Sequence, residues 1–157
     1  MNIKKILNDR IYLGYIHDLI NDQTLSLEKF VHHHHTTRLR HCLNVSYRNY
    51  KICKLLKLDA RSAARAGLLH DFFFYDCSNY EKSNVGKGHL RAHPEIANEN
   101  ASSAFNLSAK ESDIILKHMW PITFKLPNFK ESLVIIFVDK YCALLEALRL
   151  KIKSTRI

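Results

Sequence analysis

The chain has 157 residues, 46% of them hydrophobic, and carries a net charge of +9. A chain of this length can bury a full core without help from disulfides or a structural metal, so we expect one domain over residues 1–157. The positive charge favours anionic partners such as nucleotides and other small phosphorylated molecules. The four cysteines form no paired motif and fit the core of a protein in a reducing cytosol.

The N-terminal segment carries charges throughout and has no apolar run before a cleavage site, which argues against a signal peptide. The most apolar run, residues 133–138, is too short to span a bilayer. We therefore expect a cytoplasmic protein with no membrane partner. No nucleic-acid-binding motif accompanies the basic composition, so nucleic acid is not an expected partner either.

In chain order, helical spacing of apolar residues dominates the first half. It predicts a helix over residues 3–20 and a short helix over 25–33. A strong amphipathic helix is predicted over 38–58, followed by an alanine-rich helix over 60–70. The pattern is lost between residues 72 and 91, where a long loop is expected.

Three more helices are predicted in the second half. A proline suits the first turn of a helix over residues 94–105. Ser108 and Glu111 form a capping box, which predicts a helix over 109–118. The last helix, over about 129–150, is apolar almost all round, which is typical of a central, buried helix. No convincing strand is visible, so the expected fold is all-α with six or seven helices.

Two aspartates stand in apolar surroundings that a free carboxylate would not tolerate. His70-Asp71 follows two leucines at the end of the alanine-rich helix, in LLHDF. Asp139 lies in the central helix, in LVIIFVDKYCALL. A buried carboxylate without a partner costs several kcal/mol or is forced into its neutral form. A buried ion pair would explain Asp139 alone, whereas a bound metal ion would explain both placements.

His41, in RLRHCLNVS near the start of a helix, completes a recognisable set. The order His41, His70-Asp71, Asp139 resembles the H…HD…D pattern of HD-superfamily metal-dependent phosphohydrolases. The resemblance covers about residues 37–147, with the N-terminal helices of residues 3–35 packed on that core. The contexts RxxHCLNVS and AGLLHD are typical of the family. The resemblance implies that these four residues bind a metal ion.

Two further histidines extend the resemblance. His93 is expected at the start of a helix and His118 at the end of one. The pattern is similar to the two-metal H…HD…H…H…D subset, and to the branch that hydrolyses diadenosine tetraphosphate. This implies a second ion bound by His93 and His118, with Asp71 bridging, although either histidine could instead cap a helix or lie on the surface. Such ligands suit two divalent ions of Fe, Mn, Co, Ni or Zn.

The resemblance also implies a reaction. A metal-bound hydroxide would attack phosphorus in a nucleotide or another small phosphoester or phosphoanhydride, with Asp71 orienting the bound water. Two dications against two carboxylates leave a site that attracts phosphate. Arg38 stands one helical turn before His41, where a solvent-exposed ion pair is the alternative. The residues that we expect to bind phosphate are Arg38, Lys87, His89 and Arg91.

Related activities are partly separable by sequence. The HDxGK continuation of the cyclic-dinucleotide branch is absent, because HDFFFYD stands in its place. Di-iron HD proteins that oxidise organic substrates with O₂ use the same six ligands, so that chemistry remains an alternative. A non-catalytic nucleotide sensor is the other alternative, and it would bind nucleotide without metal.

Overall fold

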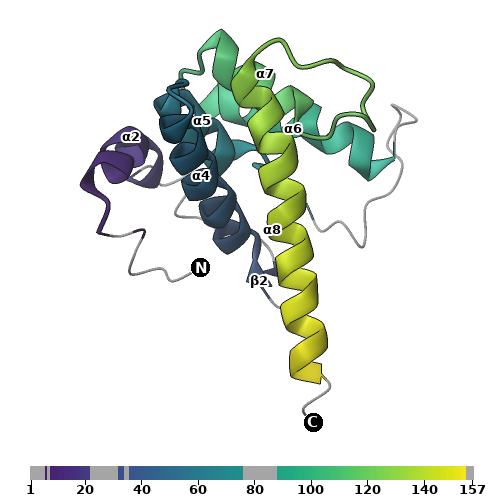
Figure 1. Cartoon of the computed structure of the whole chain (residues 1–157). Helices are drawn as coiled ribbons and strands as arrows, with labels where there is room; N and C mark the ends of the chain where they lie inside the picture. The colour runs from purple at the N-terminus through teal and green to yellow at the C-terminus, as the bar shows by residue number, and fades with distance from the viewer. Residues whose placement is uncertain (1–5, 7, 22–31, 34–35, 76–87, 155–157) are drawn as a thin grey trace.

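The computed structural model describes residues 6, 8–21, 32–33, 36–75 and 88–154, and shows an all-α domain (Figure 1). The predicted fold class is therefore confirmed. In these residues a two-residue antiparallel pair, β1 (His32–His33) with β2 (Thr36–Thr37), is the only sheet. The predicted helix over 25–33 lies outside the described residues except for the last two, which form β1. The six described helices are α2 (Arg10–Ile20), α4 (Arg38–Leu55), α5 (Ala60–Leu69), α6 (His89–Ala104), α7 (Ala109–Lys117) and α8 (Lys130–Ser154).

Helix α2 begins later than the apolar spacing predicted, because Asp9 caps it. The Asp9 carboxylate accepts a hydrogen bond from the amide of Tyr12 at 3.2 Å, which is how an N-cap aspartate starts a helix. The buried face of α2 packs on α5. Tyr12 also reaches α4, where its hydroxyl lies 2.8 Å from Ser46 Oγ.

Helices α4 and α5 pack closely because α5 presents small residues. A Cβ on Gly67 would lie 2.8 Å from the Cα of Ser46, so only glycine fits at this crossing. Polar groups of α4 complete the contact: Ser46 donates to the carbonyl of Ala64 at 2.6 Å, and Asn49 donates to that of Ala63 at 3.0 Å. This contact fixes α5, whose C-terminal end carries His70, against α4.

Arg65 joins α5 to two other helices. Its side chain is 3% exposed and its Nε donates to Glu111 Oε1 at 2.6 Å, which ties α5 to α7. Its terminal nitrogen forms an ion pair with Asp18 of α2. Since a buried cation needs close anionic partners, this arrangement holds α5 in one position relative to both neighbours.

Helix α6 begins at His89, with Gly88 as its N-cap, rather than at the proline that the sequence suggested. His89 and Arg91 therefore lie in the helix and not in the preceding loop. Pro94 is the sixth residue of α6 and is buried. A proline inside a helix removes one hydrogen bond. The helix nevertheless continues through Pro94, with Ala92, Ala97 and Ala101 buried against the domain.

Helix α8 is central in its contacts, because it packs on α4, α5 and α7 (Figure 1). Its inner face buries Ile135, Val138 and Cys142. The expectation that it is buried all round is wrong, because its outer face exposes a row of large apolar side chains, with Phe137 as much as 71% exposed. Those side chains are Leu133, Phe137, Tyr141, Leu144 and Leu148.

Within the described residues, no helix combines the length and the hydropathy that crossing a membrane requires.

Candidate metal centre

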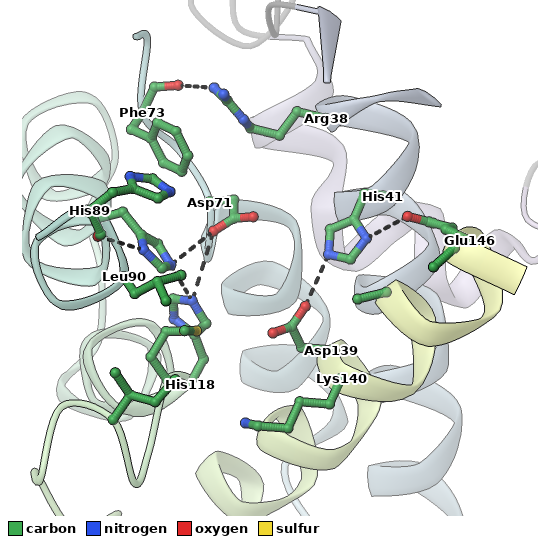
Figure 2. A pocket seen from close by; sticks show the side chains of 15 residues that line it. Arg38, His41, Asp71, Phe73, His89, Leu90, His118, Asp139, Lys140 and Glu146 are labelled. Atoms are coloured by element: carbon green, nitrogen blue, oxygen red, sulfur yellow. Dashed lines mark hydrogen bonds and ion pairs between the residues drawn. The ribbon is translucent and has the colours of Figure 1, made fainter. Parts of the chain in front are cut away.

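Five helices bring six side chains together, and Figure 2 labels His41, Asp71, His118 and Asp139 among them. They fall into three overlapping groups of three, and within each group the donor atoms lie within 4.8 Å of one another. Every residue that the sequence suggested as a metal ligand belongs to at least one group. The six are His41 of α4, His70 and Asp71 at the end of α5, His93 of α6, His118 at the end of α7 and Asp139 of α8.

The first part of the cluster surrounds His70, whose side chain is fully buried. Its Nε2 lies 3.6 Å from Asp71 Oδ2 and 3.6 Å from Asp139 Oδ1. His41 reaches the same carboxylate, with its Nε2 3.0 Å from Asp139 Oδ1. These four residues therefore direct two imidazole nitrogens and two carboxylates toward a shared space.

The second part of the cluster lies on the other side of Asp71. His93 Nε2 is 3.4 Å and His118 Nε2 is 3.8 Å from Asp71 Oδ1. Asp71 therefore turns one oxygen toward His70 and the other toward His93 and His118. This arrangement would allow the Asp71 carboxylate to hold one cation on each side.

Three of the imidazoles are fixed in one tautomer by the backbone. In each, Nδ1 lies within 3.1 Å of a carbonyl oxygen of its own helix, and a carbonyl only accepts hydrogen bonds. Nδ1 must therefore carry the proton, which leaves the lone pair of Nε2 directed at the cluster. Metal-binding histidines are usually held in this way. The pairs are His70 with Gly67, His93 with His89, and His118 with Ile115.

Two observations indicate that a cation fits this cluster. The Nε2 atoms of His93 and His118 lie 2.9 Å apart with both lone pairs facing inward, which is repulsive unless a positive charge lies between them. Two nitrogens bound to one ion at about 2.1 Å and at right angles would be about 3.0 Å apart. In addition, the buried Nε2 of His70 has no hydrogen-bond partner in the described part of the chain.

The charge states of His93, His118 and Asp71 also suit metal binding. Burial, together with the neighbouring His93, lowers the pKa of His118 to about 3, and burial lowers the pKa of His93 as well. Both imidazoles are therefore neutral at pH 7. Burial would raise the pKa of Asp71, but the surrounding histidines outweigh burial and lower it. Neutral imidazole and ionised carboxylate are the forms that bind metal ions.

Glu146 belongs to this centre, although the sequence analysis missed it. Its Oε2 lies 3.0 Å from His41 Nδ1, on the side of the ring opposite Asp139. Burial opposes a charge on His41, but hydrogen bonds to the two carboxylates outweigh it and raise the pKa of His41 to about 10. Glu146 follows Asp139 by seven residues, two helical turns, and this spacing places both on one face of α8. That spacing was the available signal.

A cavity of about 530 Å³ opens in front of the cluster, a size typical of small-molecule sites. Lys140, which the sequence analysis also missed, lines it and donates a hydrogen bond to the carbonyl of Trp120 at 3.2 Å. The other lining residues outside the cluster are mainly apolar. They are Phe73, Leu90, Met119, Ile122, Ala143 and Ala147, together with Arg38, His89 and Glu146.

Arg38 lines the cavity but is not the solvent-exposed ion pair that was the alternative for it. Its side chain is 2% exposed, and its guanidinium donates to the carbonyl of Tyr75 and to that of Phe73, the second of which Figure 2 shows. The guanidinium carbon also lies 3.8 Å from the centre of the Phe73 ring. Arg38 therefore fixes the segment that follows Asp71.

The other candidate phosphate-binding residues differ in position. His89 lines the cavity, stacks on His93 with ring centres 4.8 Å apart, and has its Nδ1 3.0 Å from the hydroxyl of Tyr75. Arg91 is exposed, lies over the ring of Phe124 and is not among the described residues that line the cavity. Lys87 lies outside the described residues.

The chain matches no protein-family model, no curated protein and no solved structure. What it binds and does is therefore inferred from its own donor atoms and cavity.

Proposed function

We propose that this chain is a metal-dependent phosphohydrolase of the HD superfamily, acting on a nucleotide or another small phosphoester or phosphoanhydride. The observation that carries the proposal is the position of Asp71. Its two oxygens face two separate imidazole groups at one wall of a small-molecule cavity. Two ions that share one carboxylate would fit there, and these donors suit Fe, Mn, Co, Ni or Zn.

Two bound ions would supply the chemistry, and residues of this chain would hold them. When bound, the ions would lower the pKa of a water molecule and offset negative charge on the phosphate. The chain holds the donors ready by fixing the tautomers of three histidines through backbone carbonyls. The first ion would be bound by His41, His70, Asp71 and Asp139, and the second by Asp71, His93 and His118.

The cavity walls support a phosphorylated substrate. Lys140 and His89 both line the cavity and place positive charge or a proton donor beside the cluster. Leu90, Met119 and Ile122 form an apolar wall that would hold the organic part of the substrate and exclude water. Arg38 acts indirectly, because its guanidinium holds two backbone carbonyls next to the cavity.

The proposed reaction is a hydrolysis in which one bond to phosphorus is exchanged. An oxygen derived from water forms a new bond to phosphorus, and the bond between phosphorus and the leaving oxygen breaks. The leaving oxygen takes up a proton, for which His89 and Lys140 are the candidate donors in the cavity.

The test combines metal analysis with a substrate panel. The purified chain, loaded in turn with Mn²⁺, Fe²⁺ and Co²⁺, is assayed for phosphate release from nucleoside mono-, di- and triphosphates, diadenosine tetraphosphate and simple phosphoesters. His70→Ala and Asp71→Ala should lose metal and activity while circular dichroism stays helical, because the core is large enough to fold without metal. His17→Ala, an exposed histidine of α2, is the matched control and should retain both.

The same assays distinguish the alternatives. Full metal content in both His70→Ala and Asp71→Ala would contradict the proposed centre. Substrate-dependent O₂ uptake by the iron-loaded chain, without phosphate release, would favour the oxygenase. Nucleotide binding by metal-free protein without turnover would favour the sensor.

A further inference from the structure

The four imidazoles of the centre are not all held by the same kind of partner. His70, His93 and His118 each donate their Nδ1 proton to a neutral backbone carbonyl. His41 is different, because its Nδ1 lies 3.0 Å from the Glu146 carboxylate. A carboxylate partner makes an imidazole more electron-rich than a carbonyl does, and it adds a negative charge behind the ring.

Glu146 is itself held in place. Its other oxygen accepts a hydrogen bond from the Asn44 amide at 3.4 Å, one helical turn along α4 from His41. The Glu146 side chain is 18% exposed, so solvent screens it only partly. Together, His41 and Asn44 of α4 and Glu146 of α8 join the two helices beside the first group of donors, and Figure 2 shows the contact of His41 with Glu146.

Glu146 is not placed to bind an ion directly. It contacts the ring nitrogen of His41 that faces away from Asp139. None of the potential metal-binding groups found among the described residues includes it. Its effect on an ion at this centre would therefore pass through His41.

The two halves of the cluster also differ in charge. The half around His70 has two carboxylates, Asp71 and Asp139, with Glu146 behind His41. The half formed by His93 and His118 has only the Asp71 carboxylate, which it shares. Since a cation is attracted by each nearby negative charge, the first half is the stronger site, and an ion there weakens the attraction for a second.

We propose that Glu146 is a positioning residue that makes the His41 site the tighter of two unequal metal sites. It holds His41 with Nε2 directed at the ion and strengthens that imidazole as a ligand. The centre then fills in order: first the site of His41, His70, Asp71 and Asp139, and afterwards the site of His93 and His118. The inference rests on the proposed two-metal function.

The test is a calorimetric titration of the metal-free full chain with Mn²⁺, a readout independent of activity. The unchanged chain should bind in two steps, one tight and one weak. Glu146→Gln keeps the shape and an acceptor oxygen but removes the charge, and should weaken the tight step by about tenfold to a hundredfold. Glu146→Ala should weaken it further. Neither substitution should change the affinity of the weak step, apart from the change that follows from altered occupancy of the first site.

Two control variants make the result specific. His118→Ala should abolish the weak step and leave the tight one. Glu99→Gln, an exposed glutamate of α6, should change neither step. Urea unfolding of each metal-free variant measures any loosening of the contact between α4 and α8 separately from metal affinity.

The outcomes separate this inference from the proposed function. If the chain binds two ions and Glu146→Gln leaves the tight step unchanged, or weakens both steps equally, the inference is wrong and the proposed function stands. If the unchanged chain binds none of Mn²⁺, Fe²⁺, Co²⁺, Ni²⁺ and Zn²⁺, the proposed function itself is wrong. Selective loss of the tight step, graded from Gln to Ala, supports the inference.

Discussion

His93 and His118 are the residues that distinguish a two-metal centre from a one-metal centre. If His93 and His118 hold a second ion, His118→Ala should lose about half of the bound metal and most of the activity. Activity should fall further than occupancy, because a water shared by two ions has the lowest pKa. Elemental analysis and phosphate release measure the two effects. One ion per chain, with no change of rate in His118→Ala, would indicate a mononuclear phosphatase instead.

Arg38 offers a second prediction at the scale of single residues. Because it donates to the carbonyls of Phe73 and Tyr75, Arg38→Met should lower the free energy of unfolding by about 2–3 kcal/mol. Arg38→Lys should lower it less, since a lysine can still reach one carbonyl. Urea unfolding of metal-free protein measures both. An unchanged unfolding free energy together with a raised KM would show that Arg38 binds the substrate phosphate instead.

At the scale of helices, the sequence correctly predicted a helix start that is determined by hydrogen bonds between neighbouring residues. The capping box of Ser108 and Glu111 set the start of α7 correctly, because both hydrogen bonds form within four residues. The start of α6 was misplaced, because the helix continues ahead of Pro94, where Ala92 and His93 are buried, despite the hydrogen bond that the proline removes. The exposed row on α8 was missed for a related reason: apolar composition does not show which side meets the domain.

The candidate metal ligands could also be predicted from local sequence, whereas the role of Glu146 as the partner of His41 could not. Asp71 and Asp139 stand out because burying a carboxylate among apolar residues costs free energy unless a cation or hydrogen bonds stabilise it. Glu146 lies in a helical stretch of ordinary polarity, and its contact with His41 joins residues 105 positions apart. The seven-residue spacing from Asp139 places Glu146 on the same face of α8, but only the packing of α8 against α4 shows that His41 is its partner.

The crossing of α4 and α5 can be tested with one methyl group. Gly67→Ala would place a Cβ 2.8 Å from the backbone of Ser46, so the two helices must move apart. We expect a loss of about 1–3 kcal/mol in unfolding free energy, and weaker metal binding because His70 moves with α5. Gly14→Ala is the matched control: nothing lies within 4 Å of its new Cβ, and it should stabilise α2 by up to about 1 kcal/mol. Equal effects of the two variants would contradict the close approach.

For the molecule as a whole, the centre couples stability to pH. In metal-free protein, His118 has a pKa of about 3 when folded against an ordinary 6.5, so folding releases its proton, and stability falls as pH drops from 6.5 toward 3. His41 has a pKa of about 10 when folded, so its contribution is complete below pH 6.5 and is lost as pH rises toward 10. The metal-free protein should therefore be most stable near pH 6.5.

Urea unfolding in the presence of a chelator, over a pH series, measures this profile. His118→Gln should flatten the acid side and His41→Gln the alkaline side, because each removes one of the groups responsible. A profile that keeps both slopes in the two variants would mean that other groups determine it.

The segment that follows His118 contains a fluorophore that should report metal binding at the second site. The chain has one tryptophan, Trp120, two residues after His118, and its carbonyl accepts a hydrogen bond from Lys140 at the cavity. A paramagnetic ion such as Mn²⁺ or Co²⁺ bound by His118 should quench the fluorescence of Trp120, which lies two residues along the chain, whereas Zn²⁺ should quench it far less. Emission should therefore follow the filling of the second site in the intact chain, and His118→Ala should abolish that response while the tryptophan remains.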